Sequence, residues 1–193
     1  FMVEIELKFL IGKDNLTDLL KCLEKQSFVI SKTRIHELSV MYDNSDGLMQ
    51  KTDGRIRVRQ SGDKVELAYK KPISRKGIKK EIEYEVVISD LGDLQAILRE
   101  MKFEPGSSYE RYRTEYVLSN VKIALDEYPF ASFIEIEGTE SDIINVAKKL
   151  NFKLTDNLTD SCDTLFTKWR EQKGLSPKPH MKFDDYDNGI LLK

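Results

Sequence analysis

Alternation between apolar and polar residues recurs along the chain and predicts β-strands. Residues 2–11 alternate strictly, and residues 28–43 have an extended pattern. Gly54 precedes the alternating stretch RIRVRQ, and the turn SGD at 61–63 leads into KVELAYK, which predicts a β-hairpin. Further strands are predicted near 80–88, 109–118, 121–128 and 132–138.

Helical spacing separates these strands. Leucines between residues 16 and 23 share one face of a predicted helix at about 15–26, which Asp14 or Asn15 can cap. Asp90 is predicted to start a helix that reaches about residue 101, and two more are predicted near 140–150 and 157–172. Because the strands follow one another in hairpin-like succession, the pattern indicates an α+β protein with an antiparallel sheet or barrel and peripheral helices.

The polar face of several strands carries mainly charged residues. Residues two apart in a strand point to the same face. The charged faces consist of Glu4, Glu6 and Lys8, of Arg55, Arg57 and Arg59, of Glu81, Glu83 and Glu85, and of Glu135 and Glu137. Lys70 and Arg113 hold comparable positions, whereas the facing of Asp126 stays open because it follows the apolar Ala124 on its side of the strand.

Two interpretations compete for these charged faces. For any single strand, an ordinary sheet with its charged face in water is the better interpretation. Taken together, the repeated glutamates and arginines favour a closed sheet whose charged face lines the interior, because buried charges need partners or a metal ion. SRKG at 74–77, together with Lys79 and Lys80, is interpreted as a basic loop that is solvated or, as the second interpretation, forms a mouth that attracts polyphosphate.

The residue types suggest one kind of ligand, a metal-bound polyphosphate. Carboxylates supply the oxygen ligands that Mg²⁺ and Mn²⁺ prefer. Arginine recognises phosphate oxygens in a planar, bidentate way, and lysine adds a point charge. Phosphoryl transfer depends mainly on positioning and on neutralising the phosphoryl oxygens, which metal and arginine together provide.

Length and composition narrow the possibilities further. The chain has 193 residues, which predicts one domain at 2–173 and an irregular C-terminal appendage at 174–193. The formal net charge is −2, with many charges of both signs, which argues against binding of nucleic acid or a membrane surface. Cys22 and Cys162 form no paired-cysteine motif, and no secretory signal or membrane span is evident, so a cytoplasmic protein is expected.

The charged strands resemble those of a known family. Glu4-Ile-Glu6-Leu-Lys8 resembles the N-terminal ExExK signature of the CYTH superfamily, the triphosphate tunnel metalloenzymes. Later segments resemble further family motifs in the family order, namely MYDNSDGLMQ at 41–50, GRIRVR at 54–59, LAYK at 67–70, RYRTEY at 111–116, ALDEY at 124–128 and FIEIEG at 133–138. Arg55 has no counterpart in the motif, and Ser39 and Met41 replace an acidic and an aromatic residue of the family pattern.

The resemblance implies a fold and a set of site residues. It implies an eight-stranded, mostly antiparallel closed β-barrel with peripheral helices. It implies that triphosphate is bound by Lys8, Arg57, Arg59, Lys70 and Arg113. It implies that Mg²⁺ or Mn²⁺ is bound from among Glu4, Glu6, Glu83, Asp126, Glu135 and Glu137. Glu4, Glu6 and Lys8 are the expected catalytic residues.

Several functions remain open at this point. The first is metal-dependent hydrolysis of inorganic triphosphate or of an organic or nucleoside triphosphate. The second is a class IV-type adenylate cyclase that converts ATP to cyclic AMP and pyrophosphate. The third is a non-catalytic protein that binds polyphosphate or nucleotide, and the fourth is a purely structural role for mutually neutralised charges. The expected partner is a small-molecule triphosphate, with the oligomeric state left open.

Overall fold

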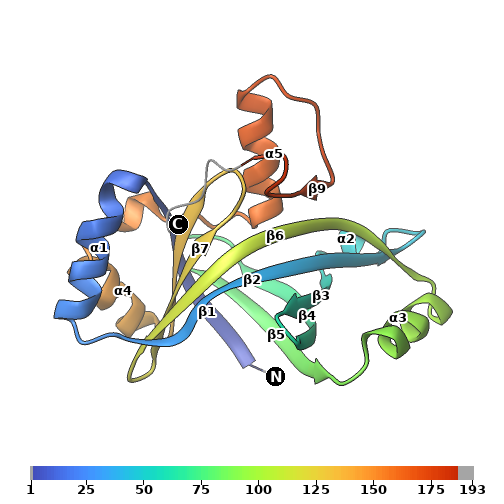
Figure 1. Ribbon diagram of the computed structural model, residues 1–193, viewed down its shortest axis with the longest axis horizontal. Coiled ribbons are helices and arrows are strands. Elements are labelled where there is room, and N and C mark those ends of the chain that lie inside the picture. Colours follow the sequence, from blue (N-terminus) through green and yellow to red (C-terminus); the bar gives the residue numbers. More distant parts are fainter. Residues whose placement is uncertain (1, 187–193) are drawn as a thin grey trace.

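The computed structural model describes residues 2–186 and has a closed antiparallel β-barrel at its centre (Figure 1). Eight strands form the barrel, in the order β2-β3-β4-β5-β1-β8-β7-β6, and pairing of β6 with β2 closes it. The strands are β1 (Met2–Ile11), β2 (Val29–Asn44), β3 (Arg55–Ser61), β4 (Lys64–Ser74), β5 (Lys79–Ile88), β6 (Phe103–Leu118), β7 (Val121–Glu127) and β8 (Ser132–Glu137). The predicted α+β barrel with peripheral helices is confirmed.

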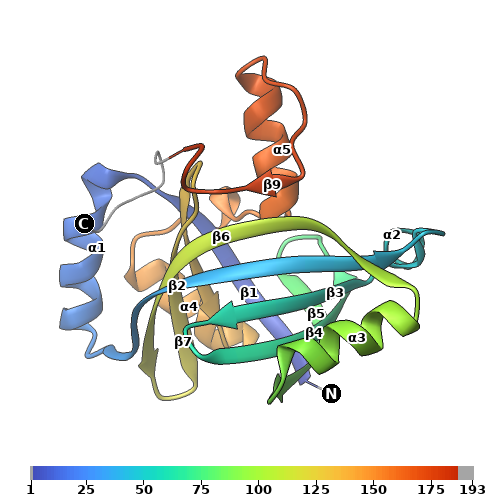
Figure 2. The same ribbon diagram turned by 45° about the vertical axis from the view of Figure 1, so that its right-hand side comes forward.

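Strands β2 and β6 are the longest of the barrel and cross it side by side (Figures 1 and 2). The sequence predicts the sixth strand from about residue 109, but β6 begins at Phe103. The extra residues pair with the end of β2, where Asn44 lies opposite Phe103. A local pattern cannot reveal this extension, because the partner that stabilises it lies about 60 residues away in the chain.

The helices cover the apolar outside of the barrel. They are α1 (Lys13–Lys25), α2 (Leu48–Thr52), α3 (Leu91–Glu100), α4 (Glu140–Lys149) and α5 (Cys162–Gln172), with a 3-10 turn at Leu154–Asp156. Helices α1 and α4 enclose the main core, in which Ile134, Ile136 and Ile143 are completely buried. Helix α3 packs on β3 and β4 through Leu94 and Leu98. Within residues 2–186, no helix is both long and apolar enough to cross a membrane.

The helix starts differ in how well the sequence predicts them. Asp90 caps α3 as expected, because its side chain accepts a hydrogen bond from the Asp93 amide. The predicted caps of α1 are wrong. The helix begins two residues earlier than expected, with Gly12 at its N-cap and no side-chain cap. Asp14 therefore lies in the first turn, where its negative charge favours the helix dipole.

The segment after α5 folds back onto the barrel. A short strand, β9 (His180–Met181), pairs in parallel with Ser108 and Tyr109 of β6. Tyr186 packs against Trp169 of α5, with ring centroids 5.2 Å apart. The division into a domain at 2–173 and an appendage at 174–193 remains a prediction, and its last residues, 187–193, lie outside the described residues.

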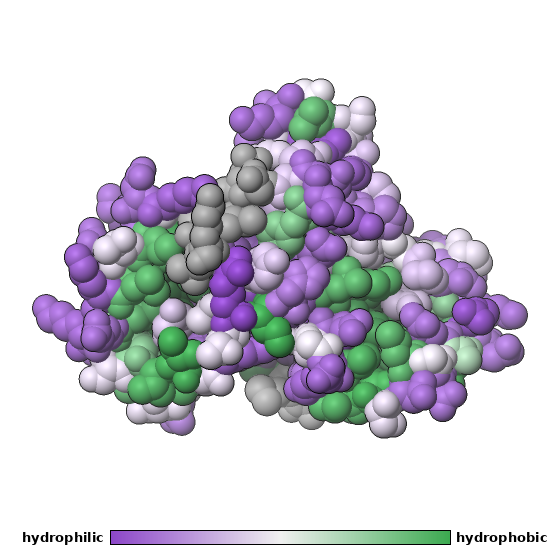
Figure 3. Space-filling model, in the orientation of Figure 1, coloured by the Kyte–Doolittle hydropathy of each residue, from purple (hydrophilic) through white to green (hydrophobic). Residues whose placement is uncertain are grey.

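The outer surface is mostly hydrophilic, with apolar side chains gathered in the region of β5 and α3 (Figure 3, lower right). Val86, Val87, Ile97 and Met101 are among the exposed large apolar residues of this region. In the barrel strands, the apolar residues of the alternating sequence pattern therefore lie on the outside of the barrel. Its charged side chains point inward.

Candidate functional site

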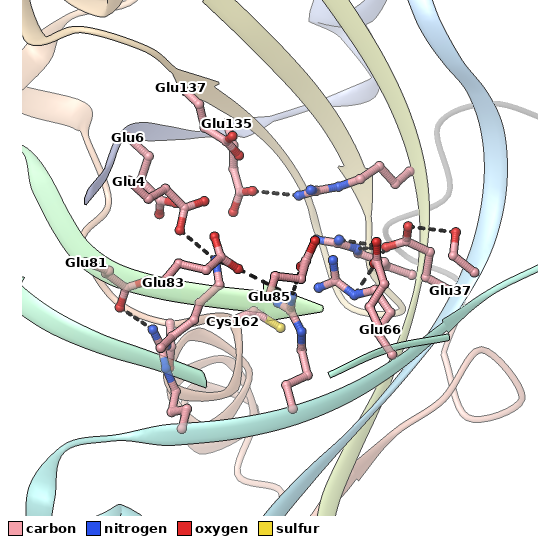
Figure 4. Close-up of a pocket in the computed structure, with 18 of the residues that line it drawn as sticks. Glu4, Glu6, Glu37, Glu66, Glu81, Glu83, Glu85, Glu135, Glu137 and Cys162 are labelled. Atoms are coloured by element: carbon pink, nitrogen blue, oxygen red, sulfur yellow. Dashed lines mark hydrogen bonds and ion pairs between the residues drawn. The ribbon is translucent and has the colours of Figure 1, made fainter. Parts of the chain in front are cut away.

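The barrel encloses a cavity of about 1080 Å³ whose wall is unusually rich in charge (Figure 4). All eight barrel strands contribute side chains, and the start of α5 adds Ser161, Cys162 and Asp163. Among the described residues, eleven lysines and arginines and eleven acidic side chains line it. The formal charges of the wall therefore cancel. A single one of these charges buried without a partner would carry a large desolvation cost.

The acidic side of the cavity lies on the neighbouring strands β5, β1 and β8. Glu4 and Glu6 follow each other on one face of β1, and the register places Glu6 opposite Glu137 of β8. One carboxylate oxygen from each of Glu4, Glu6 and Glu137 lies within 4.8 Å of the others. We call these three residues the carboxylate trio. It is the kind of oxygen cluster that Mg²⁺ or Mn²⁺ prefers.

Each carboxylate of the trio pairs with a different lysine. Lys70 lies 2.6 Å from Glu4, Lys79 lies 2.9 Å from Glu6, and Lys122 lies 2.7 Å from Glu137. These ion pairs offset the repulsion among three carboxylates that are held close together in a poorly solvated wall.

Two carboxylates of the trio, Glu4 and Glu137, have pKa values that are shifted in opposite directions. Burial acts to raise the pKa of Glu4, but Lys70 outweighs it and the pKa falls to about 2. Burial raises the pKa of Glu137 to about 7, against the opposing effect of Lys122. At neutral pH Glu4 is therefore ionised, whereas the protonated and ionised forms of Glu137 are both populated. A divalent cation would favour the ionised form of both.

The basic side lies on β6 and β3, on either side of β2. Arg111 and Arg59 converge on Glu37 of β2, at 2.6 Å and 3.5 Å respectively. Arg111 and Arg113 both donate to Asp126, which is completely buried. These carboxylates hold the guanidinium groups in fixed positions around the cavity (Figure 4).

The structure divides the six acidic residues predicted to bind metal. Glu4, Glu6 and Glu137 form the trio, whereas the other three lie outside this cluster and contact lysines or arginines of the protein. Glu83 lies 3.1 Å from Lys70, Glu135 lies 3.1 Å from Lys8, and Asp126 contacts the two arginines named above. The donor set of the trio therefore fits a divalent ion, and Asp126, set behind the arginines, is not among the residues that line the cavity.

All five residues predicted to bind triphosphate line the cavity, namely Lys8, Arg57, Arg59, Lys70 and Arg113. Their surroundings differ. Arg57 and Arg59 belong to the basic side, whereas Lys8 and Lys70 lie among the glutamates of the acidic side. The buried Nε of Arg57 has no hydrogen-bond partner among the described residues, so this guanidinium retains a donor for a ligand.

Lys8 is also held by the segment that leads to α5. Its amide donates to Asn157 Oδ1 and its carbonyl accepts from the Leu158 amide, both at 2.8 Å. Its ammonium donates to the Asp160 carbonyl at 3.4 Å. The position of this cation therefore depends on two parts of the chain that lie 149 residues or more apart.

Sequence reasoning missed several members of the wall. Lys79 was assigned to a solvated loop, and this is wrong, because it begins β5, is 6% exposed and pairs with Glu6 and Glu81. Arg55, which has no counterpart in the motif, pairs with Glu81. Arg111 and Glu37 carry a usable signal, since each lies two residues before a position already singled out, Arg113 and Ser39 respectively.

Tyr109 of β6 adds a phenol to the basic side, and its titration can be predicted. Burial acts to raise the pKa of Tyr109, but Arg59, Arg57 and Arg111 lower it to about 8. A phenol should therefore ionise near pH 8 in the folded protein, well below the usual 10. The absorbance of phenolate near 295 nm measures this. The step should disappear in Tyr109→Phe and persist in Tyr42→Phe, whereas a step that survives in Tyr109→Phe would contradict the assignment.

Comparisons with known proteins agree with this architecture. The model of the CYTH domain family matches residues 2–158. A Methanocaldococcus jannaschii protein, provisionally named an adenylate cyclase, is 26% identical over 178 residues, which span 90% of this chain and 100% of the relative.

Solved structures share the fold. A provisionally named adenylate cyclase from Vibrio parahaemolyticus aligns with a TM-score of 0.75 at 16% identity, over 86% of this chain and 98% of that one. A Hippeastrum protein, provisionally named an adenylyl cyclase and described as having a dominant triphosphatase activity, aligns with a TM-score of 0.61 at 15% identity, over 94% and 100%. A Pyrococcus horikoshii protein is 25% identical, with a TM-score of 0.63 over 86% and 98%.

Proposed function

The chain belongs to the CYTH domain family, and from this premise we propose that it hydrolyses a triphosphate that enters the barrel together with a divalent metal ion. The observation that carries the proposal is the charge pattern of the cavity. Its wall is neutral as a whole, yet arginines gather on one side and the carboxylate trio on the other. A metal-bound triphosphate has the same two parts, a strongly negative chain and a cation.

The basic side supplies the groups that bind phosphate oxygens. Among the described residues, the Nε of Arg57 has no hydrogen-bond partner, and the ion pairs of its guanidinium are with Glu85 at 3.3 Å and Glu83 at 3.8 Å. A phosphate group offers more charge and more acceptors than one carboxylate, so it replaces these weak contacts. Arg59 and Arg111 are held by Glu37 at the same side, and both line the cavity, where their charge attracts the triphosphate.

The acidic side fits the metal. A divalent ion held by Glu4, Glu6 and Glu137 would neutralise charge on the phosphoryl oxygens. Lys8 lies at the edge of the acidic side that faces the basic side, because its ammonium is 3.8 Å from Glu6 and 3.1 Å from Glu135, and Glu135 also contacts Arg113 at 2.7 Å. We assign Lys8 to the phosphate group nearest the trio. The low pKa of Glu4, about 2, keeps its carboxylate ionised throughout the neutral range.

Phosphate release tests the proposal. The purified protein is incubated with inorganic triphosphate, ATP or thiamine triphosphate, each with Mg²⁺, with Mn²⁺ or with a chelator. We expect metal-dependent release of phosphate that is strongest with inorganic triphosphate and is abolished by the chelator. Release that is unaffected by the chelator would contradict the role of the trio.

A cyclase is the second candidate, and the names of the relatives favour it. In that reaction the ribose hydroxyl of ATP attacks the α-phosphate, and cyclic AMP and pyrophosphate form. Cyclic AMP in the ATP reaction, without phosphate from inorganic triphosphate, would decide for the cyclase. Ser39 and Met41 leave room for a third outcome, in which triphosphate binds tightly and neither product forms.

A further inference from the structure

Lys70 and Lys79 each contact a second carboxylate on β5 besides their partner in the trio, whereas Lys8, which lies 3.8 Å from Glu6, has its second contact with Glu135 of β8. Lys70 lies 2.6 Å from Glu4 and 3.1 Å from Glu83. Lys79 lies 2.9 Å from Glu6 and 2.8 Å from Glu81. In both cases the second carboxylate belongs to β5, the strand beside the one that carries Glu4 and Glu6.

The second carboxylates are already partners of the same two lysines, and Glu81 pairs with Arg55 as well. Lys79 makes its hydrogen bond to Glu6, whereas the buried Oε2 of Glu81 receives no hydrogen bond from any described residue, although the Lys79 ammonium lies close to it. Glu83 lies directly opposite Lys70 in the ladder between β4 and β5. Each ammonium can therefore give up its contact with the trio and keep the ion pair with β5 that it already has.

Binding of a divalent ion makes such a movement favourable. The ion needs the oxygens of Glu4 and Glu6 and repels the two ammonium groups that now contact them. An ammonium that left the trio without a new partner would be a buried, unpaired charge, which is strongly unfavourable. With Glu81 and Glu83 in reach, neither lysine loses its partner.

We propose that Lys70 and Lys79 are exchangeable counter-ions of the trio, which move to Glu83 and Glu81 when a divalent ion binds. In this assignment Glu81 and Glu83 are positioning residues that receive the lysines, and they do not ligate the metal. The inference rests on the metal site of the proposed function and is independent of the reaction that follows.

Titration of Mn²⁺ by calorimetry tests the exchange without any substrate. Lys79→Met removes the competing cation and should bind Mn²⁺ about tenfold more tightly than the wild type, a size typical of groups that act through a ligand. Glu81→Gln removes the acceptor, so Lys79 stays on Glu6 and affinity should fall about tenfold. The double variant Lys79→Met/Glu81→Gln should resemble Lys79→Met, because without the lysine no acceptor is needed.

A matched control separates this effect from a general change in charge. Lys80→Met removes the same charge from the next residue, whose ammonium pairs with Glu140 on the outside of the barrel at 2.8 Å, and its affinity should stay within about twofold of the wild type. Thermal unfolding followed by circular dichroism checks that each variant folds. Lys79→Gln keeps a polar group and replaces Lys79→Met if the latter unfolds.

Three outcomes would overturn the exchange. Mn²⁺ binding that is unchanged or weaker in Lys79→Met and Lys79→Gln would show that the lysine does not compete. A double variant as weak as Glu81→Gln would identify Glu81 as a ligand. Absence of Mn²⁺ binding in the wild type would overturn the metal site together with the proposed function, whereas the expected pattern without phosphate release would support the exchange and refute hydrolysis.

Discussion

Replacing Glu6 with glutamine is expected to lower metal-dependent phosphate release by about a thousandfold. Glu6 is the central residue of the trio, since it follows Glu4 on β1 and lies opposite Glu137. Glutamine keeps the shape of the side chain and removes the charge that binds the metal. Charge neutralisation by a metal ion is worth several kcal/mol, and about 1.4 kcal/mol corresponds to a tenfold change in rate.

Initial rates measured over a range of Mn²⁺ concentrations check this expectation. Glu140→Gln makes the same substitution on an exposed ion pair outside the barrel and should retain the wild-type rate. Because Lys79 still has Glu81 as a partner, Glu6→Gln should unfold at nearly the wild-type temperature. Full activity of Glu6→Gln at limiting Mn²⁺ would refute its assignment as a metal ligand.

Replacing Asp126 with asparagine is expected to lower the free energy of unfolding by about 3–5 kcal/mol, the usual cost of breaking a buried ion pair. Asp126 is completely buried and accepts hydrogen bonds from Arg111 and Arg113, at distances between 2.5 and 3.0 Å. Without its charge, two buried guanidinium groups lose their shared partner. Urea denaturation of both proteins measures the difference.

Asp53→Asn provides the matched comparison. Asp53 forms an ion pair with Arg75 at 2.5 Å, but both side chains are exposed, so the loss should stay below about 1 kcal/mol. A similarly small loss in Asp126→Asn would mean that Glu37 and Glu135, which already contact Arg111 and Arg113, suffice to hold the arginines.

The sequence predicts the strands and their charged faces well because both depend on local alternation. In RIRVR and EIEYE, the apolar neighbours in the same strand determine which face of the sheet each charged side chain lies on. The fold class followed from the same signal, since the strands come in succession and the helices have apolar faces of their own.

What the sequence could not predict depends on which strands are neighbours. Which acidic residues form the trio and which pair with lysine or arginine outside it follows from the strand register, for example of β8 against β1 and of β7 against β6. The facing of Asp126 stayed open because Ala124, its neighbour on the same face, is small and apolar. Lys79 was missed because it lies at a strand boundary, where local patterns are least reliable.

The attachment of Lys8 to the segment at Asn157–Asp160 determines when the cavity becomes complete. One wall includes β1, yet its lysine reaches its final position only by bonds to residues about 150 positions later. Contacts of such sequence separation form late in folding, because a long loop must close before they contribute. Until residues 157–160 dock against β1, the glutamates and arginines of the wall therefore lack a finished cavity to hold them.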